Sequence, residues 1–178
     1  MAKKEVNAII CLGSIIQGET KHFDFVCNAV AIGIKDLNIP NLEMQFSWIR
    51  VSGNRVFISG HIALNADGSI SEVTGKVGGA VTVEQGYEAA RQTGLAILSS
   101  LKQELGTLNN ITAWLRVFGM VSVEPGFVKT PPVINGFSDL IIDVFGKEIG
   151  NHSRSAVGMA ELPFGAPVEI EAEVEIST

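Results

Sequence analysis

The sequence predicts a two-layer α/β domain in which two helices cover one face of a mixed β-sheet. Three observations predict it. The expected elements follow one another in the order β-β-α-β-α-β-β. The chain of 178 residues is about the size of one domain, and its 46% hydrophobic and 18% charged residues are typical of a protein with a buried core. No internal repeat, and no linker rich in proline and glycine, divides it.

A hairpin opens the regular structure. Residues 46–51 and 55–62 are rich in β-branched and aromatic side chains. They flank residues 52–54, where the pair Gly53-Asn54 suits a tight turn with positive φ. A polar and glycine-rich stretch follows, in which Asp67-Gly68 indicates another turn.

A long helix comes next. Thr82 and Gln85 have the spacing of a capping box, and Gly106 is a good C-terminal stop. Residues 112–121 then alternate as a strand. We expect one of two sets in that strand to face the helices: Trp114, Arg116, Phe118 and Met120, or Ala113, Leu115, Val117 and Val121.

A second helix is expected to begin with Thr130 as its N-cap and Pro131 in its first turn, and to end near Gly146. Two strands, 154–162 and 167–176, close the chain.

Because two helices cover only one face of a sheet, the apolar side chains of the other face need a partner. We therefore expect a homo-oligomer.

Composition narrows the function classes. The 13 Lys and Arg against 19 Asp and Glu give a net charge of −6, so the chain lacks the basic surplus of nucleic-acid binders. No apolar run reaches the roughly 20 residues that a transmembrane helix needs. Cys11 and Cys27 indicate free thiols in a cytoplasmic protein. Neither they nor the three scattered histidines form a zinc signature, so we expect no metal.

Arg154 is the first candidate for chemistry. On a strand it shares a face with Ala156, Gly158 and Ala160, and these small residues leave room for a ligand. Its planar guanidinium group can bind a carboxylate through two hydrogen bonds. The alternative interpretation is an ion pair with a glutamate at a subunit interface.

The last strand supplies the second candidate. Glutamates alternate there with apolar residues, which predicts apolar side chains toward the core and carboxylates outward: Glu169, Glu171, Glu173 and Glu175. Such a row is typical of a solvated face. Neighbouring like charges nevertheless raise carboxylate pKa values, so one of the four can serve as a general base over a pocket. Periodicity does not identify which one.

Four stretches resemble the RidA/YjgF family, whose older name is endoribonuclease L-PSP: SGNRVFISGHI, EAARQT, PPVINGFSDL and, most specifically, HSRSAVGMAELPFGAPVEIEAEV. The resemblance runs from about residue 44 to residue 176. We therefore expect residues 1–30 to be an N-terminal extension and residues 31–178 to be the RidA/YjgF-like domain.

The resemblance implies a chorismate-mutase-like fold assembled as a homotrimer with sites between subunits. It also implies a hydrolase that converts reactive enamine and imine intermediates to 2-keto acids and ammonia without a metal or organic cofactor. By position, Arg154 matches the residue that binds the substrate carboxylate, and Glu169 matches the residue that orients the attacking water. Asn135 and Ser59 match supporting polar positions of the substrate-binding site.

Three positions differ from the family pattern. Phe46 stands in the substrate-binding set where the family has tyrosine, Ala156 replaces a cysteine, and His61 replaces a glutamine. By itself, a lone histidine such as His61 is typical of a structural residue. Two other functions stay open: a non-catalytic regulatory trimer that binds a small carboxylate metabolite, and the ribonuclease of the older name, which the acidic composition disfavours.

Overall fold

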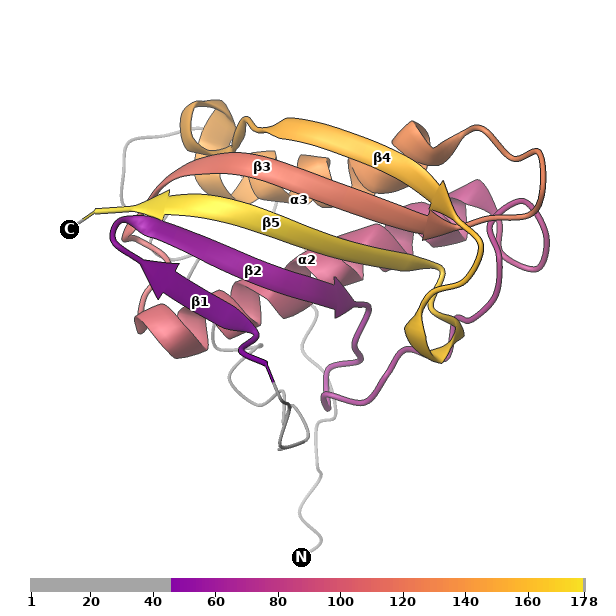
Figure 1. Ribbon diagram of the computed structural model, residues 1–178, viewed down its shortest axis with the longest axis horizontal. Coiled ribbons are helices and arrows are strands. Elements are labelled where there is room, and N and C mark those ends of the chain that lie inside the picture. The colour runs from indigo at the N-terminus through magenta and orange to yellow at the C-terminus, as the bar shows by residue number, and fades with distance from the viewer. Residues whose placement is uncertain (1–45, 178) are drawn as a thin grey trace, which may run out of the picture.

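The computed structural model describes residues 46–177. They form a five-stranded sheet with the strand order β1-β2-β5-β3-β4, together with two α-helices and a short 3-10 turn (Figure 1). The elements are β1 (Ile49–Ser52), β2 (Arg55–Ile62), α2 (Val83–Leu105), β3 (Ile111–Ser122), α3 (Thr130–Gly150), β4 (Ser153–Met159), η1 (Pro163–Gly165) and β5 (Val168–Ile176). The predicted order of strands and helices is confirmed.

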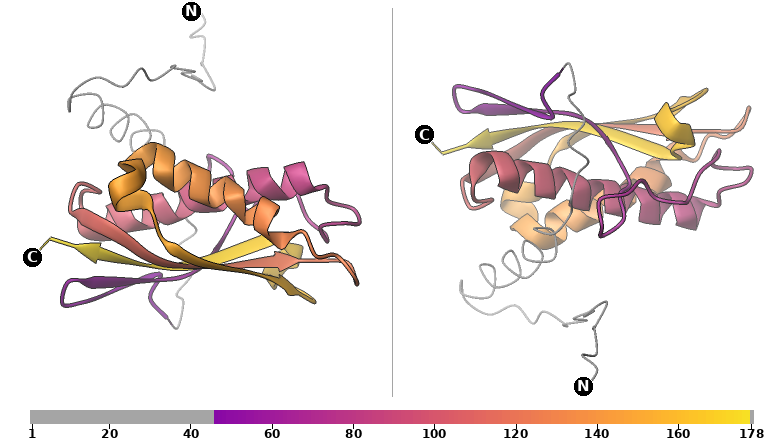
Figure 2. Two further views of the ribbon diagram at one scale, coloured as in Figure 1. Left: turned by 90° about the horizontal axis from the view of Figure 1, so that it is seen from above. Right: turned by 90° about the horizontal axis from the view of Figure 1, so that it is seen from below.

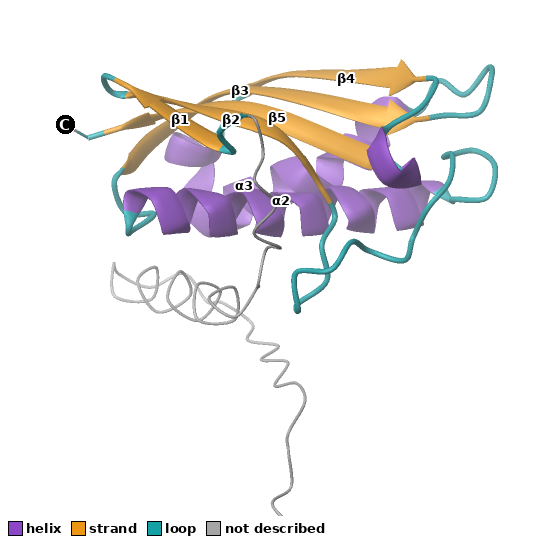
Figure 3. Ribbon diagram, turned by 60° about the horizontal axis from the view of Figure 1, so that its bottom comes forward, coloured by secondary structure: helices purple, strands orange, loops and turns teal. Residues whose placement is uncertain are grey.

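Both helices pack on one face of the sheet, and no described element covers the opposite face (Figures 2 and 3). β3 and β4 are parallel and are joined through α3, whereas the other neighbouring strands are antiparallel. The predicted two-layer architecture with a mixed sheet is therefore confirmed. We call the uncovered side the open face.

Helix α2 forms where its termini predict it. The Thr82 hydroxyl accepts a hydrogen bond from the Gln85 N–H at 3.2 Å, and the Gln85 side chain accepts one from the Thr82 N–H at 2.9 Å. This capping box satisfies two N–H groups that the first turn leaves free. At the other end, Gly106 follows the helix with φ 74°, a conformation that glycine adopts without strain.

Helix α3 differs from its prediction at both ends. Lys129 occupies the N-cap position, and the Thr130 hydroxyl donates instead to the Ala156 carbonyl at 3.0 Å. The hydroxyl thus ties the helix to β4 rather than capping it. Gly146 has φ 73° and marks a kink, beyond which the helix continues to Gly150. Strand β4 in turn ends at Met159, so the predicted strand 154–162 was too long at its end.

Strand β3 does not alternate strictly, so neither predicted set faces the helices as a whole. The register with β5 shifts between Trp114 and Arg116, and Leu115 is the inserted residue. A β-bulge of this kind resets the alternation of side chains. On either side of the bulge, Trp114, Val117, Gly119 and Val121 are buried, while Arg116, Phe118 and Met120 lie on the open face.

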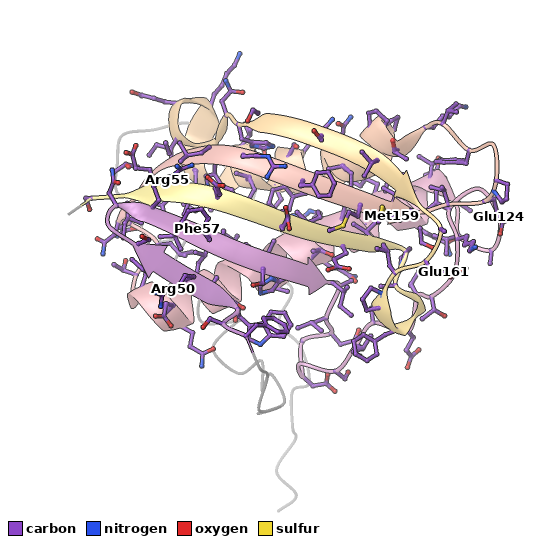
Figure 4. The ribbon with its side chains drawn as sticks, in the orientation of Figure 1. Arg50, Arg55, Phe57, Glu124, Met159 and Glu161 are labelled. Atoms are coloured by element: carbon purple, nitrogen blue, oxygen red, sulfur yellow. The ribbon has the colours of Figure 1, made fainter. Side chains whose placement is uncertain are left out.

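The open face carries the acidic side chains of β5, as the period of two predicts, and also apolar ones. Phe57 is 39% exposed there, with the Arg55 guanidinium 5.5 Å from its ring centroid. Figure 4, in the orientation of Figure 1, shows Arg55 and Phe57 on β2 and Met159 at the end of β4. A single chain does not test the homo-oligomer, which stays a prediction.

Within residues 46–177, no helix combines the length and the apolar character that crossing a membrane requires. The same part of the chain holds no group of three or more His, Cys, Asp or Glu side chains that could bind a metal ion. Cys11 and Cys27 lie outside the described residues.

Candidate active site

Arg154 projects toward the helix layer from β4, which is the edge strand of the sheet. It lies opposite Val117 of the parallel neighbour β3, and Val117 is fully buried on the helix side. The Arg154 Nη1 donates to Asn135 Oδ1 at 3.0 Å and to Ser138 Oγ at 2.9 Å. Asn135 and Ser138 are three residues apart on α3, so both side chains lie on one face of that helix.

These two hydrogen bonds use both hydrogens of Nη1. Among the described residues, no side chain or carbonyl accepts from Nε or Nη2 of Arg154. The Nε–Nη2 edge of a guanidinium group carries two parallel N–H bonds that match the two oxygens of a carboxylate. Arg154 forms no ion pair with a glutamate within the described chain, so this edge is available to a ligand.

His152 is hydrogen-bonded to Ser138, one of the two acceptors of Arg154. His152 Nε2 lies 2.9 Å from Ser138 Oγ, and His152 Nδ1 lies 2.7 Å from the Gly150 carbonyl oxygen. Partial burial, followed by the positive charge of Arg154, lowers the pKa of His152, while the bond to Gly150 acts in the opposite direction. These effects favour the neutral form of the imidazole.

Glu169 lies on the open face of β5, between Ile62 of β2 and Met120 of β3. Its partial burial and, second, the charge of Glu171 raise the pKa of its carboxyl group. Within the described residues, Glu169 has neither a hydrogen-bonding side chain nor an ion-pair partner. A carboxylate without a partner and with a raised pKa is a stronger base than an ordinary surface glutamate.

The other three glutamates of the strand each have a partner. Arg116 lies 3.7 Å from Glu171, Arg55 pairs with Glu173, and the Asn54 side chain donates to Glu175 at 2.6 Å. Periodicity did not identify which of the four glutamates can serve as a general base. The structure favours Glu169, because it alone among the four lacks a partner in the described chain.

Ser59 and Gly60 form a bulge beside Glu169. The register between β2 and β5 shifts between Ile58 and His61, so these two residues lie opposite one residue of β5. The Ser59 hydroxyl donates to the Ser47 carbonyl at 2.8 Å, and it is therefore engaged with its own chain. Gly60 leaves the space that the Glu169 carboxylate fills.

His61 and Phe46 do not present polar groups to a ligand. His61 is 4% exposed, with its Nδ1 2.7 Å from the Ser59 carbonyl and its Nε2 2.9 Å from the Ser100 hydroxyl. Burial lowers the pKa of His61 to about 4. Phe46 is 50% exposed and packs edge-on against Trp48, with the ring centroids 5.3 Å apart.

The structure brings Arg154 and Asn135 together, and it brings Gly60, the residue after Ser59 in the bulge, against Glu169. It does not join these two groups within one chain. Arg154 faces the helix layer at β4, whereas Glu169 faces the open side at β5, with β3 between the two strands.

Sequence reasoning missed three residues of this region: Ser138, His152 and Gly60. Two weak signals were present. Ser138 follows Asn135 at helical spacing, and His152 precedes Arg154 by two residues, the spacing of side chains that point the same way along extended backbone. The role of Gly60 has no local signal, because it depends on a side chain from a distant strand.

The sequence matches a known family. Residues 28–168 match the family model described as "YjgF/chorismate_mutase-like, putative endoribonuclease". This match spans most of the chain, and the chain therefore belongs to the YjgF/RidA family.

Relatives support this assignment. Protein TCP17 from Trypanosoma cruzi is 40% identical over 126 residues, which cover 71% of this chain and 78% of that protein. A crystal structure of Atu1372, a protein of unknown function from Agrobacterium tumefaciens, has a TM-score of 0.75 at 38% identity and covers 88% of this chain and 98% of that one. RidA from an Antarctic Psychrobacter has a TM-score of 0.50 at 20% identity, covers 77% and 93% of the two chains, and shows the common fold.

The N-terminal segment is similar to a different family. Residues 1–42 match the family model of 6,7-dimethyl-8-ribityllumazine synthase. The synthase from Cytophaga hutchinsonii is 68% identical over 37 residues, which are 21% of this chain and 23% of that enzyme. The chain thus spans about a quarter of the length of such a synthase, and the match is a similarity of that segment alone. The domain boundary at residue 30 stays a prediction.

Proposed function

We propose that the chain is a hydrolytic deaminase that converts reactive enamine or imine intermediates to 2-keto acids and ammonia. The observation that carries the proposal is the arrangement of Arg154. Two side chains of α3 hold its Nη1, and its Nε–Nη2 edge is left for a carboxylate. A substrate such as 2-aminoacrylate, in its imine form, has the required carboxylate next to the carbon that reacts.

In the proposed reaction, water adds to the imine carbon while its proton passes to the Glu169 carboxylate. Glu169 returns this proton to the nitrogen, which gives a neutral carbinolamine. The carbinolamine hydroxyl then gives up its proton to the amino group as the C–N bond breaks, so that ammonia leaves and a C=O bond forms. Arg154 fixes the carboxylate and hence the position of the imine carbon, and such positioning supplies a large part of the rate gain. The raised pKa of Glu169 makes its carboxylate a better proton acceptor. The step uses no metal or organic cofactor.

A site with both residues requires two copies of the chain, since Arg154 and Glu169 lie on opposite faces of one sheet. We infer that Arg154 and Asn135 of one subunit meet Glu169 and Ser59 of a neighbour in a homotrimer. The uncovered apolar side chains of the open face, Phe57 and Phe118 among them, support this assembly.

Two variants with different defects test the proposal. Arg154→Lys keeps the charge but loses the planar fork, so we expect pyruvate to bind at least about tenfold more weakly. Glu169→Gln loses the base, so ammonia release from enzymatically generated 2-aminoacrylate should fall about 100-fold while pyruvate binding is kept. Glu175→Gln is the matched control on the same face of β5. An equal loss of turnover in this control would show that the role is assigned to the wrong glutamate.

A non-catalytic binding trimer is the second candidate, because Phe46 has no hydroxyl group and Ala156 has no thiol at positions that are polar in the family. Pyruvate binding without acceleration of ammonia release would favour it. The ribonuclease ranks third, given the net charge of −6. RNA cleavage that survives ion-exchange purification and disappears in Arg154→Lys would reverse this ranking.

A further inference from the structure

We propose that Ser138 and His152 are positioning residues: they fix the guanidinium group of Arg154 and thereby determine which of its edges binds the carboxylate. The inference deepens the proposed function, since it rests on Arg154 as the carboxylate-binding residue. The family resemblance assigned a role to neither side chain.

The direction of each hydrogen bond follows from one carbonyl group. The Gly150 carbonyl can only accept, so His152 Nδ1 carries a proton, and in the neutral imidazole, which the lowered pKa of His152 favours, Nε2 then presents a lone pair. The Ser138 hydroxyl must then donate to Nε2, which leaves its oxygen lone pairs directed at Arg154. Arg154 Nη1 donates to that oxygen at 2.9 Å. This series of hydrogen bonds runs from Arg154 through Ser138 and His152 to Gly150, and at no point do two donors face each other.

The series of hydrogen bonds affects the orientation of Arg154, because Asn135 alone would accept only one hydrogen of Nη1. With Ser138 as a second acceptor, both Nη1 hydrogens are held, and the guanidinium plane cannot turn without losing a charge-assisted hydrogen bond. The Nε–Nη2 edge is then presented in one orientation before the ligand arrives. A fixed side chain loses less conformational entropy on binding than a free one.

His152 gives the Ser138 hydroxyl its direction. Without a lone pair at Nε2, the hydroxyl proton would be free to turn toward Arg154, where it would meet another donor. The His152 ring itself is held by its bond to Gly150 and by an edge-on contact with Phe137, whose ring centroid is 6.1 Å away. His152→Phe keeps this ring packing and removes the acceptor at Nε2 together with the bond from Nδ1 to Gly150, so it tests whether the histidine orients the Ser138 hydroxyl.

The experiment compares Ser138→Ala, His152→Phe and Ser138→Thr with the wild-type chain. In the first two variants we expect the Kd for pyruvate and the KM for 2-aminoacrylate to rise about five- to tenfold, as for the loss of one hydrogen bond to a charged group, with kcat within about twofold. Ser138→Thr keeps the hydroxyl group and should bind nearly as well as the wild type. Ser155→Ala, on β4 beside Arg154 but outside the hydrogen-bonded chain, is the matched control.

A second measurement does not depend on a ligand. Nitrogen-15 NMR of the Arg154 guanidinium group should show separate, slowly exchanging Nη signals in the wild type and averaged signals in Ser138→Ala and His152→Phe. Unchanged Nη signals in both variants would overturn the positioning role, whether or not the proposed function holds. Averaged signals together with no pyruvate binding by the wild type would instead uphold the positioning and refute the proposed function.

Discussion

The carboxylate of Glu169 lies directly over Gly60, in the space where any other residue would carry its Cβ. A Cβ at Gly60 would lie 2.9 Å from Glu169 Cδ and closer still to Oε1. Gly60 belongs to the bulge of β2, so the bulge and the missing side chain together create the position of the proposed base.

Gly60→Ala should therefore move the Glu169 carboxylate without unfolding the chain. The obstructing atoms belong to the end of a flexible side chain, so we expect a thermal midpoint close to that of the wild type. Turnover should fall about tenfold or more, since small displacements of catalytic groups are costly. Pyruvate binding should be unchanged. A folded Gly60→Ala variant with full turnover would contradict the assigned position of Glu169.

The acid side of the pH–rate profile should report Glu169. Its pKa is raised by burial and by Glu171, so activity should be lost on acidification at a higher pH than for an ordinary glutamate. Glu171→Gln removes a like charge, which lowers the pKa of Glu169, and this limb should then shift to lower pH. The same limb should not move in Glu175→Gln. A shift in the opposite direction would show that the titrating group is not Glu169.

His61 should make the fold sensitive to acid. Its pKa is about 4 in the folded chain, against 6.5 for an unperturbed histidine, so the unfolded chain binds a proton more readily. The stabilisation is complete above pH 6.5 and is lost as the pH falls to about 4. At 1.36 kcal/mol per pKa unit, the loss amounts to roughly 3 kcal/mol. Urea unfolding at several pH values should show this slope reduced in His61→Gln, whose amide does not titrate; an unchanged slope would exclude His61 as its source.

Light scattering should report a trimer at micromolar concentration. Phe57→Lys places a charge on the apolar part of the open face and should shift the chain toward monomers, because burying an unpaired charge is unfavourable. Glu104→Lys alters charge on the helix layer and should leave the trimer intact. A monomeric wild-type chain would contradict both the assembly and the site between subunits.

Local patterns predicted most of the fold, because its causes are local. The capping box at Thr82 and Gln85 fixes the start of α2, and the period of two in β5 separates acidic from apolar side chains. The predicted alternation of side chains failed where a β-bulge inserts one extra residue into a strand. Leu115 resets the alternation of β3, and no feature of the sequence announces an insertion whose partner is a distant strand.

The site was predictable only in part for the same reason. Arg154 and the row of glutamates are visible as residue types, and the family resemblance supplied their roles. The hydrogen-bond acceptors of Arg154 lie on α3, and the space that the Glu169 carboxylate occupies is left by Gly60 of β2, which has no side chain. These contacts join segments far apart in the chain, so only the folded arrangement shows them.

In the proposed trimer, the opposite placement of Arg154 and Glu169 on the sheet should let one subunit compensate for the defect of another. A trimer of Arg154→Lys chains lacks the carboxylate fork at every site, and a trimer of Glu169→Gln chains lacks the base at every site. When equal amounts of the two impaired proteins are unfolded together and refolded, about one site in four should combine an intact Arg154 from one chain with an intact Glu169 from its neighbour. The mixture should thus regain part of the activity that both variants have lost, whereas sites contained within one chain would regain none.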